Sequence, residues 1–258
     1  MNLGLDQKVA VVLAASKGLG KASAMALSAE GAKVIIGSRN AAELNEAAEE
    51  ISSKTGNEVS CFPVDVSNSG QLTSFINRAG KVYGRIDILV NNAGGPPFGK
   101  FESFDDTQWQ QAYEQNMLSF VRTSRLVLPF MKTAGSGRII NIVSGSVKSV
   151  LTNSVLSTAM RMGVVGMAKM LADELGVYGI TVNNIAPGLI LTDRIRHTLP
   201  RDVDPEEAIK EKAKSIPLKR IGKPEEFAAL VAFLSSAQAA YISGTTIQVD
   251  GGASRAIF

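Results

Sequence analysis

The 258-residue sequence lacks the features that mark several classes of protein. Its single cysteine, Cys61, excludes an internal disulfide and a cysteine-based zinc site, so no metal centre is expected. The formal net charge of +3, without any lysine- or arginine-rich run, does not indicate nucleic-acid binding. No signal-peptide pattern or bilayer-length apolar run occurs, so we expect a cytoplasmic protein without a membrane partner.

Short apolar runs instead alternate with helical patterns along the whole chain. The predicted strands are 8–13, 33–37, 58–63, 86–91, 138–144, 180–186 and 245–249. The predicted helices are 19–30, 41–54, 68–83, 105–132, 154–177 and 224–236. Such strands pair in parallel, and right-handed crossovers between them give a doubly wound α/β sheet that binds ligands outside the carboxyl ends of its strands. We therefore expect a single domain over residues 1–258.

Local signals support these elements and mark one irregular segment. Asn40 can cap the second helix, Thr152 to Ser154 can cap the fifth, and Pro224 fits the first turn of the sixth. Cys61 lies in a predicted strand and is expected to be a buried small hydrophobe. Residues 188–223 contain no predicted strand and lie where a substrate lid would be.

A glycine-bearing turn near the start of the chain is typical of nucleotide binding. The apolar run Val9–Leu13 is followed by Ser-Lys-Gly-Leu-Gly at residues 16–20 and then by a helical pattern. Glycines let the backbone approach a pyrophosphate, and the free N–H groups of the first helical turn face the anion. An ordinary strand-to-helix connection that happens to contain two glycines is the alternative interpretation.

Motifs at family spacing make the chain resemble the short-chain dehydrogenase/reductases. They are Leu13–Gly20, Asp65–Val66, Asn91–Gly94, Asn116, Pro187–Gly188 with Thr192, Gly222–Glu226 and Val249–Gly252. The resemblance covers essentially the whole chain and includes the 3-oxoacyl-(acyl-carrier-protein) reductases and sugar or secondary-alcohol dehydrogenases. It implies one seven-stranded Rossmann domain that binds a nicotinamide dinucleotide. The cofactor residues that it implies are Ala14, Ser16, Lys17, Gly18, Leu19, Gly20, Ser38, Arg39, Asp65, Val66, Asn92, Ala93, Gly94, Pro187, Gly188, Ile190 and Thr192.

The end of the second predicted strand favours NADP(H) over NAD(H). An NAD site would carry an acidic side chain here to bind the adenosine ribose, whereas this chain has Ser38 followed by Arg39. A guanidinium can bind a 2′-phosphate with two parallel hydrogen bonds. Lys17 lies where NADP-using members of the family often carry a second cation. Both cations could instead be solvated surface charges.

The resemblance also implies a catalytic set, and two of its members are altered. Ser144 and Asn116 are present at the family positions, but Ser157 replaces the tyrosine and Arg161 replaces the lysine. The spacing keeps both on one helix face. A serine hydroxyl is a far poorer acid than tyrosine, whose pKa is about 10. Arg161 stays protonated, so it can bind ribose or oxyanion charge but cannot relay a proton.

Three other residues could in principle donate the proton. Tyr113 precedes Asn116 by one turn, Lys148 follows Ser144 in a loop, and His197 is the only histidine. For these three the ordinary alternatives are packing, solvent exposure and an incidental lid position. Losing a positioned general acid typically costs about 10²–10⁴-fold in rate, so hydride transfer is slowed but not excluded.

The substrate side is less defined. Phe98, Phe101 and Trp109 could wall an apolar pocket or belong to the core. The charges of the lid, which we expect to form a solvated face, are Arg194, Arg196, Arg201, Asp193, Asp202 and Asp204. If Arg161 points into the pocket, an anionic substrate such as a carboxylate becomes plausible.

Three functions therefore stay open. The first is an NADP(H)-dependent oxidoreductase acting on a small-molecule carbonyl or alcohol, with water held by Ser144, Ser157 and Asn116 as proton donor. The second is an NADP(H)-binding protein without turnover, and the third is a non-redox reaction with Arg161 as anion anchor.

Two further expectations concern assembly and the phosphate turn. The family usually forms homotetramers, and small residues at Ala159, Gly163 and Gly166 would permit close helix packing between subunits, although they could equally pack on the sheet. Ala14 stands at a family glycine position. We expect its methyl group to be tolerated only with a negative φ.

Overall fold

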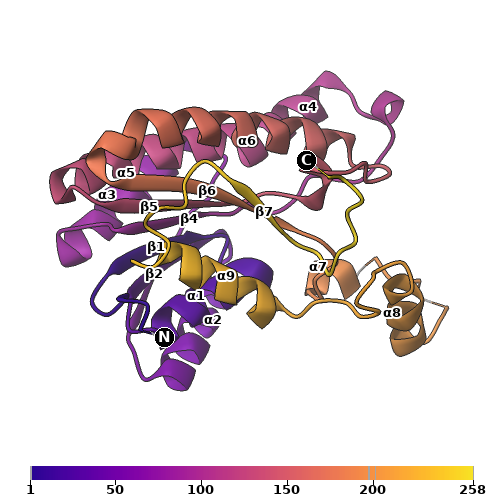
Figure 1. Cartoon of the computed structure of the whole chain (residues 1–258), viewed down its shortest axis with the longest axis horizontal. Helices are drawn as coiled ribbons and strands as arrows, with labels where there is room; N and C mark the ends of the chain where they lie inside the picture. The colour runs from indigo at the N-terminus through magenta and orange to yellow at the C-terminus, as the bar shows by residue number, and fades with distance from the viewer. Residues whose placement is uncertain (1, 197, 201, 258) are drawn as a thin grey trace.

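The computed structural model describes residues 2–196, 198–200 and 202–257. Its centre is a parallel sheet in the order β3-β2-β1-β4-β5-β6-β7 (Figure 1). The strands are β1 Val9–Leu13, β2 Lys33–Ser38, β3 Val59–Pro63, β4 Ile88–Asn91, β5 Gly137–Ile142, β6 Ile180–Pro187 and β7 Thr246–Val249. Each falls within one or two residues of a predicted strand, so the doubly wound α/β fold is confirmed.

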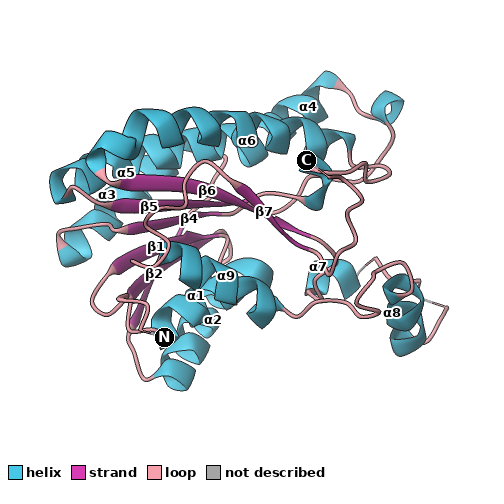
Figure 2. Ribbon diagram, viewed as in Figure 1, coloured by secondary structure: helices cyan, strands magenta, loops and turns pink. Residues whose placement is uncertain are grey.

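Helices cover both faces of this sheet (Figure 2). One face carries α1 Gly18–Ala29, α2 Ala41–Thr55 and α9 Pro224–Ser235, whose apolar side chains share a core cluster with β1 and β2. The other carries α3 Ser69–Tyr83, α5 Ser119–Ala134 and α6 Val155–Leu175, which share a second cluster with β4, β5 and β6. The inner strands β1, β2, β4, β5 and β6 are buried on both sides, which explains their largely apolar runs.

The predicted helix 105–132 is interrupted. The structure has α4 Asp106–Tyr113, a π-helical segment η2 Glu114–Leu118 and α5. A π-turn inserts one extra residue per turn and is frequent at functional sites. Here it carries Asn116, which is fully buried. The apolar periodicity continues through the insertion, which is why the sequence pattern did not reveal it.

The capping predictions are partly confirmed. Asn40 accepts hydrogen bonds from the backbone N–H groups of Ala42 and Glu43, and Pro224 begins α9. Ser154 stands at the N-cap of α6 but makes no side-chain capping bond, so that prediction is wrong in its mechanism. Cys61 is half-buried rather than buried, because its strand β3 lies at the edge of the sheet.

Among the described residues of 188–223 there is no strand beyond an isolated bridge between Ile190 and Gly222, in line with the prediction, and two short helices occur. These are α7 Asp193–Arg196 and α8 Pro205–Ala213, which lie together away from the helices that cover the sheet (Figure 1). Ala213, Ile216 and Ile221 form a small apolar cluster of their own. The segment is therefore packed locally.

Among the described residues, one helical stretch, Val155–Tyr178, is long and apolar enough to cross a membrane. It consists of α6 and the 3-10 turn η4 Gly176–Tyr178, and it connects the adjacent strands β5 and β6. One face of α6 packs on the sheet, while Met162 and Met170 are exposed on another.

A ladder of amides runs through the buried sheet, across strands that are paired residue to residue. Asn91 in β4 donates to Asn141 in β5, Asn141 donates to Asn184 in β6, each at 3.0 Å, and Asn184 donates to Thr246 in β7 at 3.1 Å. The hydroxyl of Thr123 in α5 donates to Asn91 at 2.5 Å. Every side-chain amide of this ladder is thereby satisfied as donor and acceptor.

Candidate active site

The strand order reverses between β1 and β4, which is where doubly wound sheets bind ligands. The segments that leave these two strands are joined directly, because the Asn92 side-chain amide donates to the Ala14 carbonyl oxygen at 3.3 Å. The phosphate turn and the Asn-Asn-Ala-Gly segment predicted to bind the cofactor therefore form one wall of the site.

Ala14 contradicts the expectation of a negative φ. Its φ is +47°, in the left-handed region that alanine avoids because of its β-carbon. The turn thus adopts at Ala14 a backbone conformation that glycine takes readily and alanine does not. The methyl group is accommodated by a strained conformation, not by a rebuilt turn.

The two glycines of the turn have different causes: close packing at Gly20 and a positive φ at Gly18. A β-carbon at Gly20 would collide with the carbonyl oxygen of Ala14, and Gly18 has a φ of +59°. A β-carbon at Gly18 would lie 3.7 Å from the methyl group of Thr192, which places the predicted nicotinamide-side loop beside the phosphate turn. Such a close, β-carbon-free backbone fits a pyrophosphate.

The remaining predicted cofactor residues take well-defined places. Asp65 accepts from the backbone and hydroxyl of Ser67 through Oδ1, at 2.9 and 2.7 Å, and Val66 is buried in the core. Gly188 donates its N–H to the backbone of β7, and Ile190 is buried. The other members lie beside these at strand ends or in the turn: Leu19, Ala93, Gly94 and Pro187.

The adenosine end of the site contains a carboxylate that the sequence analysis did not consider. The hydroxyls of Ser16 and Ser38 lie 3.0 Å apart, as expected for neighbouring ends of β1 and β2. Glu43, in the first turn of α2, places Oε2 at 3.4 Å from the ammonium of Lys17 and at 3.5 Å from the Ser16 hydroxyl. Arg39 is exposed and forms no ion pair with any described residue.

Arg161 acts as a three-way clamp in the centre of the site. Its Nη1 donates to the carbonyl oxygen of Ile142 at 2.7 Å, and its Nη2 donates to that of Ala93 at 3.2 Å and to Asn116 Oδ1 at 3.0 Å. The guanidinium thus joins the end of β5, the segment after β4 and the π-helical segment. The planar fork of arginine makes this possible, whereas a lysine ammonium would be a single point of contact.

The clamp is buried and positively charged. Burial, together with the charge of Arg194, lowers the pKa of Arg161 to about 10, so it stays protonated at neutral pH. No described carboxylate forms an ion pair with it, and its Cζ lies 5.0 Å above the ring of Phe120. Arg161 and Asn116 each keep one buried donor without a partner among the described residues, Arg161 Nε and Asn116 Nδ2.

Ser144 is held with its hydroxyl proton available. Its Oγ accepts from the backbone N–H of Ser146 at 3.2 Å and from the Ser146 hydroxyl at 3.0 Å. With both lone pairs engaged, the Ser144 O–H is free to donate. Ser157 is half-buried on α6, one turn before Arg161, and makes no side-chain hydrogen bond with a described residue.

The structure gives no support to Tyr113 or Lys148 as the proton donor. Tyr113 and Lys148 are half-buried and make no side-chain hydrogen bond within the described part of the chain. His197 lies outside the described residues, as does Arg201 of the lid.

Arg194 is not part of a solvated face, which corrects the prediction for the lid charges. Its guanidinium donates to the carbonyl oxygens of Gly95 at 2.9 Å and Pro96 at 3.1 Å, and its Cζ lies 5.0 Å above the ring of Phe98. Although the residue is exposed overall, burial of its guanidinium lowers its pKa. The short helix α7 is thereby attached to the loop that follows β4.

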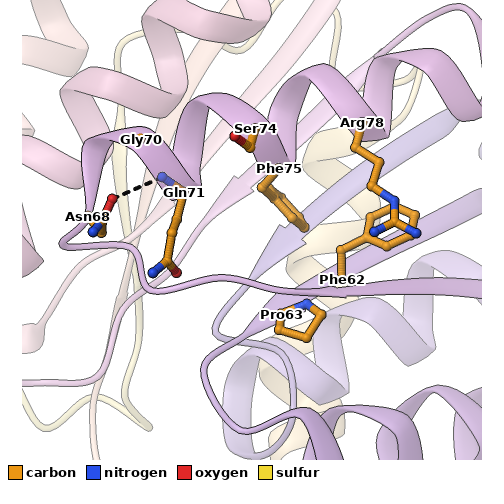
Figure 3. A pocket seen from close by; sticks show the side chains of 8 residues that line it. All are labelled: Phe62, Pro63, Asn68, Gly70, Gln71, Ser74, Phe75 and Arg78. Atoms are coloured by element: carbon orange, nitrogen blue, oxygen red, sulfur yellow. Dashed lines mark hydrogen bonds between the residues drawn. The ribbon is translucent and has the colours of Figure 1, made fainter.

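Two pockets on the surface differ in how they relate to these residues. One of about 740 Å³ is lined by Phe101, Val150 and Leu151, and it reaches Ser146, the partner of Ser144. The ring of Phe101 also packs edge-on against the ring of Trp109, with 6.1 Å between the two ring centroids. The other, of about 390 Å³, lies between β3 and α3, where Arg78 stacks on Phe62 (Figure 3). It contains no predicted site residue.

The sequence analysis did not assign a role in the site to three residues, Glu43, Ser146 and Arg194. Ser146 follows Ser144 by two residues, and a short polar side chain at that spacing commonly bonds back to its neighbour. Glu43 and Arg194 reach partners 26 and 99 residues away in the chain, and no local signal marks such contacts.

Comparison with protein families supports one assignment over nearly the full length. A family model described as enoyl-(acyl carrier protein) reductase matches residues 13–254. A 3-oxoacyl-(acyl-carrier-protein) reductase of Vibrio cholerae is 36% identical over 252 residues, which cover 97% of this chain and 98% of that protein. The 7alpha-hydroxysteroid dehydrogenase of Escherichia coli K12 is 32% identical over 253 residues, which cover 97% and 96%.

Solved structures agree. L-sorbose reductase from Gluconobacter frateurii, complexed with NADPH and L-sorbose, superposes with a TM-score of 0.96 at 32% identity, and the match covers all of both chains. YwfH, an NADPH-dependent reductase involved in bacilysin biosynthesis, gives a TM-score of 0.92 at 30% identity, covering 98% of this chain and 100% of that one.

Proposed function

The chain belongs to the short-chain dehydrogenase/reductase family, and from this we propose that it is an NADP(H)-dependent oxidoreductase that interconverts a carbonyl and an alcohol. Its active site works without the family's tyrosine and lysine. The observation that carries the proposal is the convergence of Arg161, Asn116 and the Ala93 backbone at the carboxyl ends of β4 and β5. Arg161, which we place at the family's lysine position, thus remains bonded to Asn116 and to the segment that follows β4.

The residues present fit a dinucleotide. Gly20 and Gly18 leave a backbone cradle, Asn92 ties that cradle to the segment after β4, and the unpartnered Asn116 Nδ2 and Arg161 Nε supply buried donors beside it. Lys17 and Arg39 would hold a 2′-phosphate, and Thr192 would close the nicotinamide side. When bound, the nicotinamide supplies or accepts the hydride.

The proton has a source in this chain's own side chains and water. Ser144 has a free O–H, so it can donate a hydrogen bond to a substrate oxygen and stabilise the charge that develops on it. A water bound by Ser144, Ser157 and Asn116 then delivers the proton in place of tyrosine. We expect this arrangement to be slower than a tyrosine-based one, because serine and water are poorer acids.

The contacts of Arg161 support a positioning role for this residue. Three of its five donors are committed to Ile142, Ala93 and Asn116, so it cannot turn towards a carboxylate substrate without breaking the clamp. Its buried charge can still strengthen the hydrogen bonds of Asn116. The use of Arg161 as an anion anchor is therefore the less supported alternative.

The lid proposal rests on Arg194. Residues 188–223 contain α7, which Arg194 attaches to the loop 95–98 across the carboxyl ends of the strands. The hollow lined by Phe101, Val150 and Leu151 adjoins Ser146 and offers an apolar wall for a substrate. We place the substrate between this wall and Ser144.

Direct measurement of binding and turnover tests the function. Titration calorimetry of the full chain with NADPH and NADH is expected to show tighter binding of NADPH. NADPH oxidation is then followed at 340 nm with a panel of ketones, keto acids and keto esters. Slow turnover with at least one class supports the reductase. Failure to bind either dinucleotide would overturn the proposal at its base.

A second candidate function is an NADP(H)-binding protein without turnover. It is favoured by Ser157, whose hydroxyl has no partner within the described residues, and by the commitment of Arg161 to backbone carbonyls. Tight NADPH binding without oxidation across the whole panel supports this candidate over the first.

We also propose a homotetramer. A β-carbon at Gly163 would press on Met117, so this glycine serves packing within the chain. Gly166 has open space around it, and Ala159, Met162 and Met170 are exposed on α6, which leaves an apolar face for a second copy. Sedimentation velocity of the full chain tests this assembly; a monomer at micromolar concentration would refute it.

A further inference from the structure

The phosphate turn and the start of α2 are connected by a single carboxylate oxygen. Glu43 Oε2 lies 3.4 Å from Lys17 Nζ and 3.5 Å from Ser16 Oγ, and Ser16 in turn bonds Ser38. Lys17, in the turn after β1, and Arg39, directly after β2, are the two cations that a 2′-phosphate would need. In the described structure one of the two cations of this corner is therefore already neutralised from within the chain.

The orientation of Glu43 is set by the helix on which it stands. The side chain of Asn40 accepts from the N–H groups of Ala42 and Glu43, which fixes the backbone of the first turn of α2, from which the Glu43 side chain reaches Lys17. The next carboxylate on the helix, Glu46, is exposed and pairs with no described cation. The contact of Glu43 with Lys17 is thus specific to one position.

A carboxylate and a 2′-phosphate compete for the same ammonium. A phosphate monoester carries about −1.5 to −2 charges at pH 7, so it would be repelled by Glu43 as well as deprived of a free Lys17. A ribose 2′-hydroxyl carries no charge and can donate to a carboxylate. The same contact therefore opposes NADP(H) and tolerates NAD(H).

We infer that Glu43 is a specificity-determining residue that weakens the preference for NADP(H) by occupying Lys17. This rests on the proposed cofactor binding, which it refines. Binding of NADP(H) requires the Glu43–Lys17 pair to open, and Arg39 then supplies the second cation. NAD(H) binds with the pair closed. The chain consequently uses both cofactors with a smaller ratio of affinities than Lys17 and Arg39 alone would give.

The test is the neutral substitution Glu43→Gln, with Glu46→Gln as the matched control on the same helix. Affinities for NADPH, NADH and adenosine 2′,5′-bisphosphate are measured by titration calorimetry in 20 mM and 300 mM salt. Glu43→Gln is expected to tighten NADPH and the bisphosphate by about threefold to tenfold at low salt, and less at high salt. NADH affinity should stay constant or weaken.

The Lys17→Met background separates occupation of Lys17 from simple repulsion. There, Glu43→Gln should give a smaller gain for NADPH than in the wild-type background. Equal NADPH affinities for Glu43→Gln and Glu46→Gln would overturn the inference while leaving the proposed function intact. A wild-type chain that binds neither dinucleotide would instead remove the proposed function, and the inference with it.

Discussion

Arg161 Nη2 donates to Asn116 Oδ1 at 3.0 Å, so two side chains that the sequence analysis assigned to one catalytic set are bonded directly. The same guanidinium donates to the Ile142 and Ala93 carbonyl oxygens. Arg161 therefore connects three elements of the fold.

Replacing Arg161 by lysine is expected to destabilise the protein. Arg161→Lys keeps the charge but cannot bond all three acceptors, which leaves buried oxygens unpaired. We expect a loss of about 1–3 kcal/mol in the free energy of unfolding, measured by urea denaturation. Arg125→Lys, at an exposed position of α5, is the control and should change stability little. Equal stabilities for both variants would contradict the clamp.

Ser144 and its neighbour are predicted to differ in their effect on turnover. Ser144→Ala removes the free O–H and should lower kcat by about 10²-fold or more with little change in NADPH affinity. Ser146→Ala removes only one bond that orients Ser144 and should cost about tenfold or less. Ser149→Ala in the same exposed loop is the control. Steady-state kinetics and NADPH titration separate these outcomes, and an unchanged kcat in Ser144→Ala would remove Ser144 from the mechanism.

Ala14→Gly is predicted to stabilise the phosphate turn. The φ of +47° is strained for alanine and ordinary for glycine. The relief exceeds the extra entropy cost of glycine, so we expect a gain of up to about 1 kcal/mol by urea denaturation. Ala15→Gly, next in the chain and fully buried, should lose stability instead. A loss in both variants would show that Ala14 is not strained.

Glu226 makes stability depend on acid. Its carboxylate accepts two bonds from Arg220, at 2.7 and 2.6 Å, and one from the Lys223 backbone, which lowers its pKa from 4.5 to about 2. A lowered folded pKa contributes stability above pH 4.5 that is lost as the pH falls towards 2.

The stability difference between wild type and Glu226→Gln should therefore be full near neutral pH and shrink between pH 4.5 and 2. Urea midpoints measured across this range check it. Glu225→Gln, exposed and without an ion pair among the described residues, is the control. A difference that stays constant with pH would show that the pair does not form.

The sequence was sufficient for the elements of the fold because their signals are local. The buried strand Val9–Leu13 is a continuous apolar run, and the side chain of Asn40 caps α2, which begins at the next residue. Family spacing was enough to place Ser144, Asn116 and Arg161 in one region of the sheet.

What Arg161 and Glu43 contact could not be predicted in the same way. The acceptors of Arg161 are backbone carbonyls, and any residue supplies one, so no sequence pattern identifies them. Glu43 was overlooked because the acid expected at a ribose site stands at the end of β2, whereas Glu43 reaches it from the first turn of α2. The π-turn around Asn116 changes helical phase without changing composition.

The amide ladder bears on how the sheet assembles. Asn91, Asn141, Asn184 and Thr246 all donate or accept in one direction across four strands that pair residue to residue. A shift of one residue between any two of these strands would turn an amide to the opposite face of the sheet. The neighbouring side chain would then lose its hydrogen-bond partner. Each such error costs about 1–3 kcal/mol, which apolar strands alone would not impose. The ladder thus favours the pairing register that these four strands show over registers shifted by one residue.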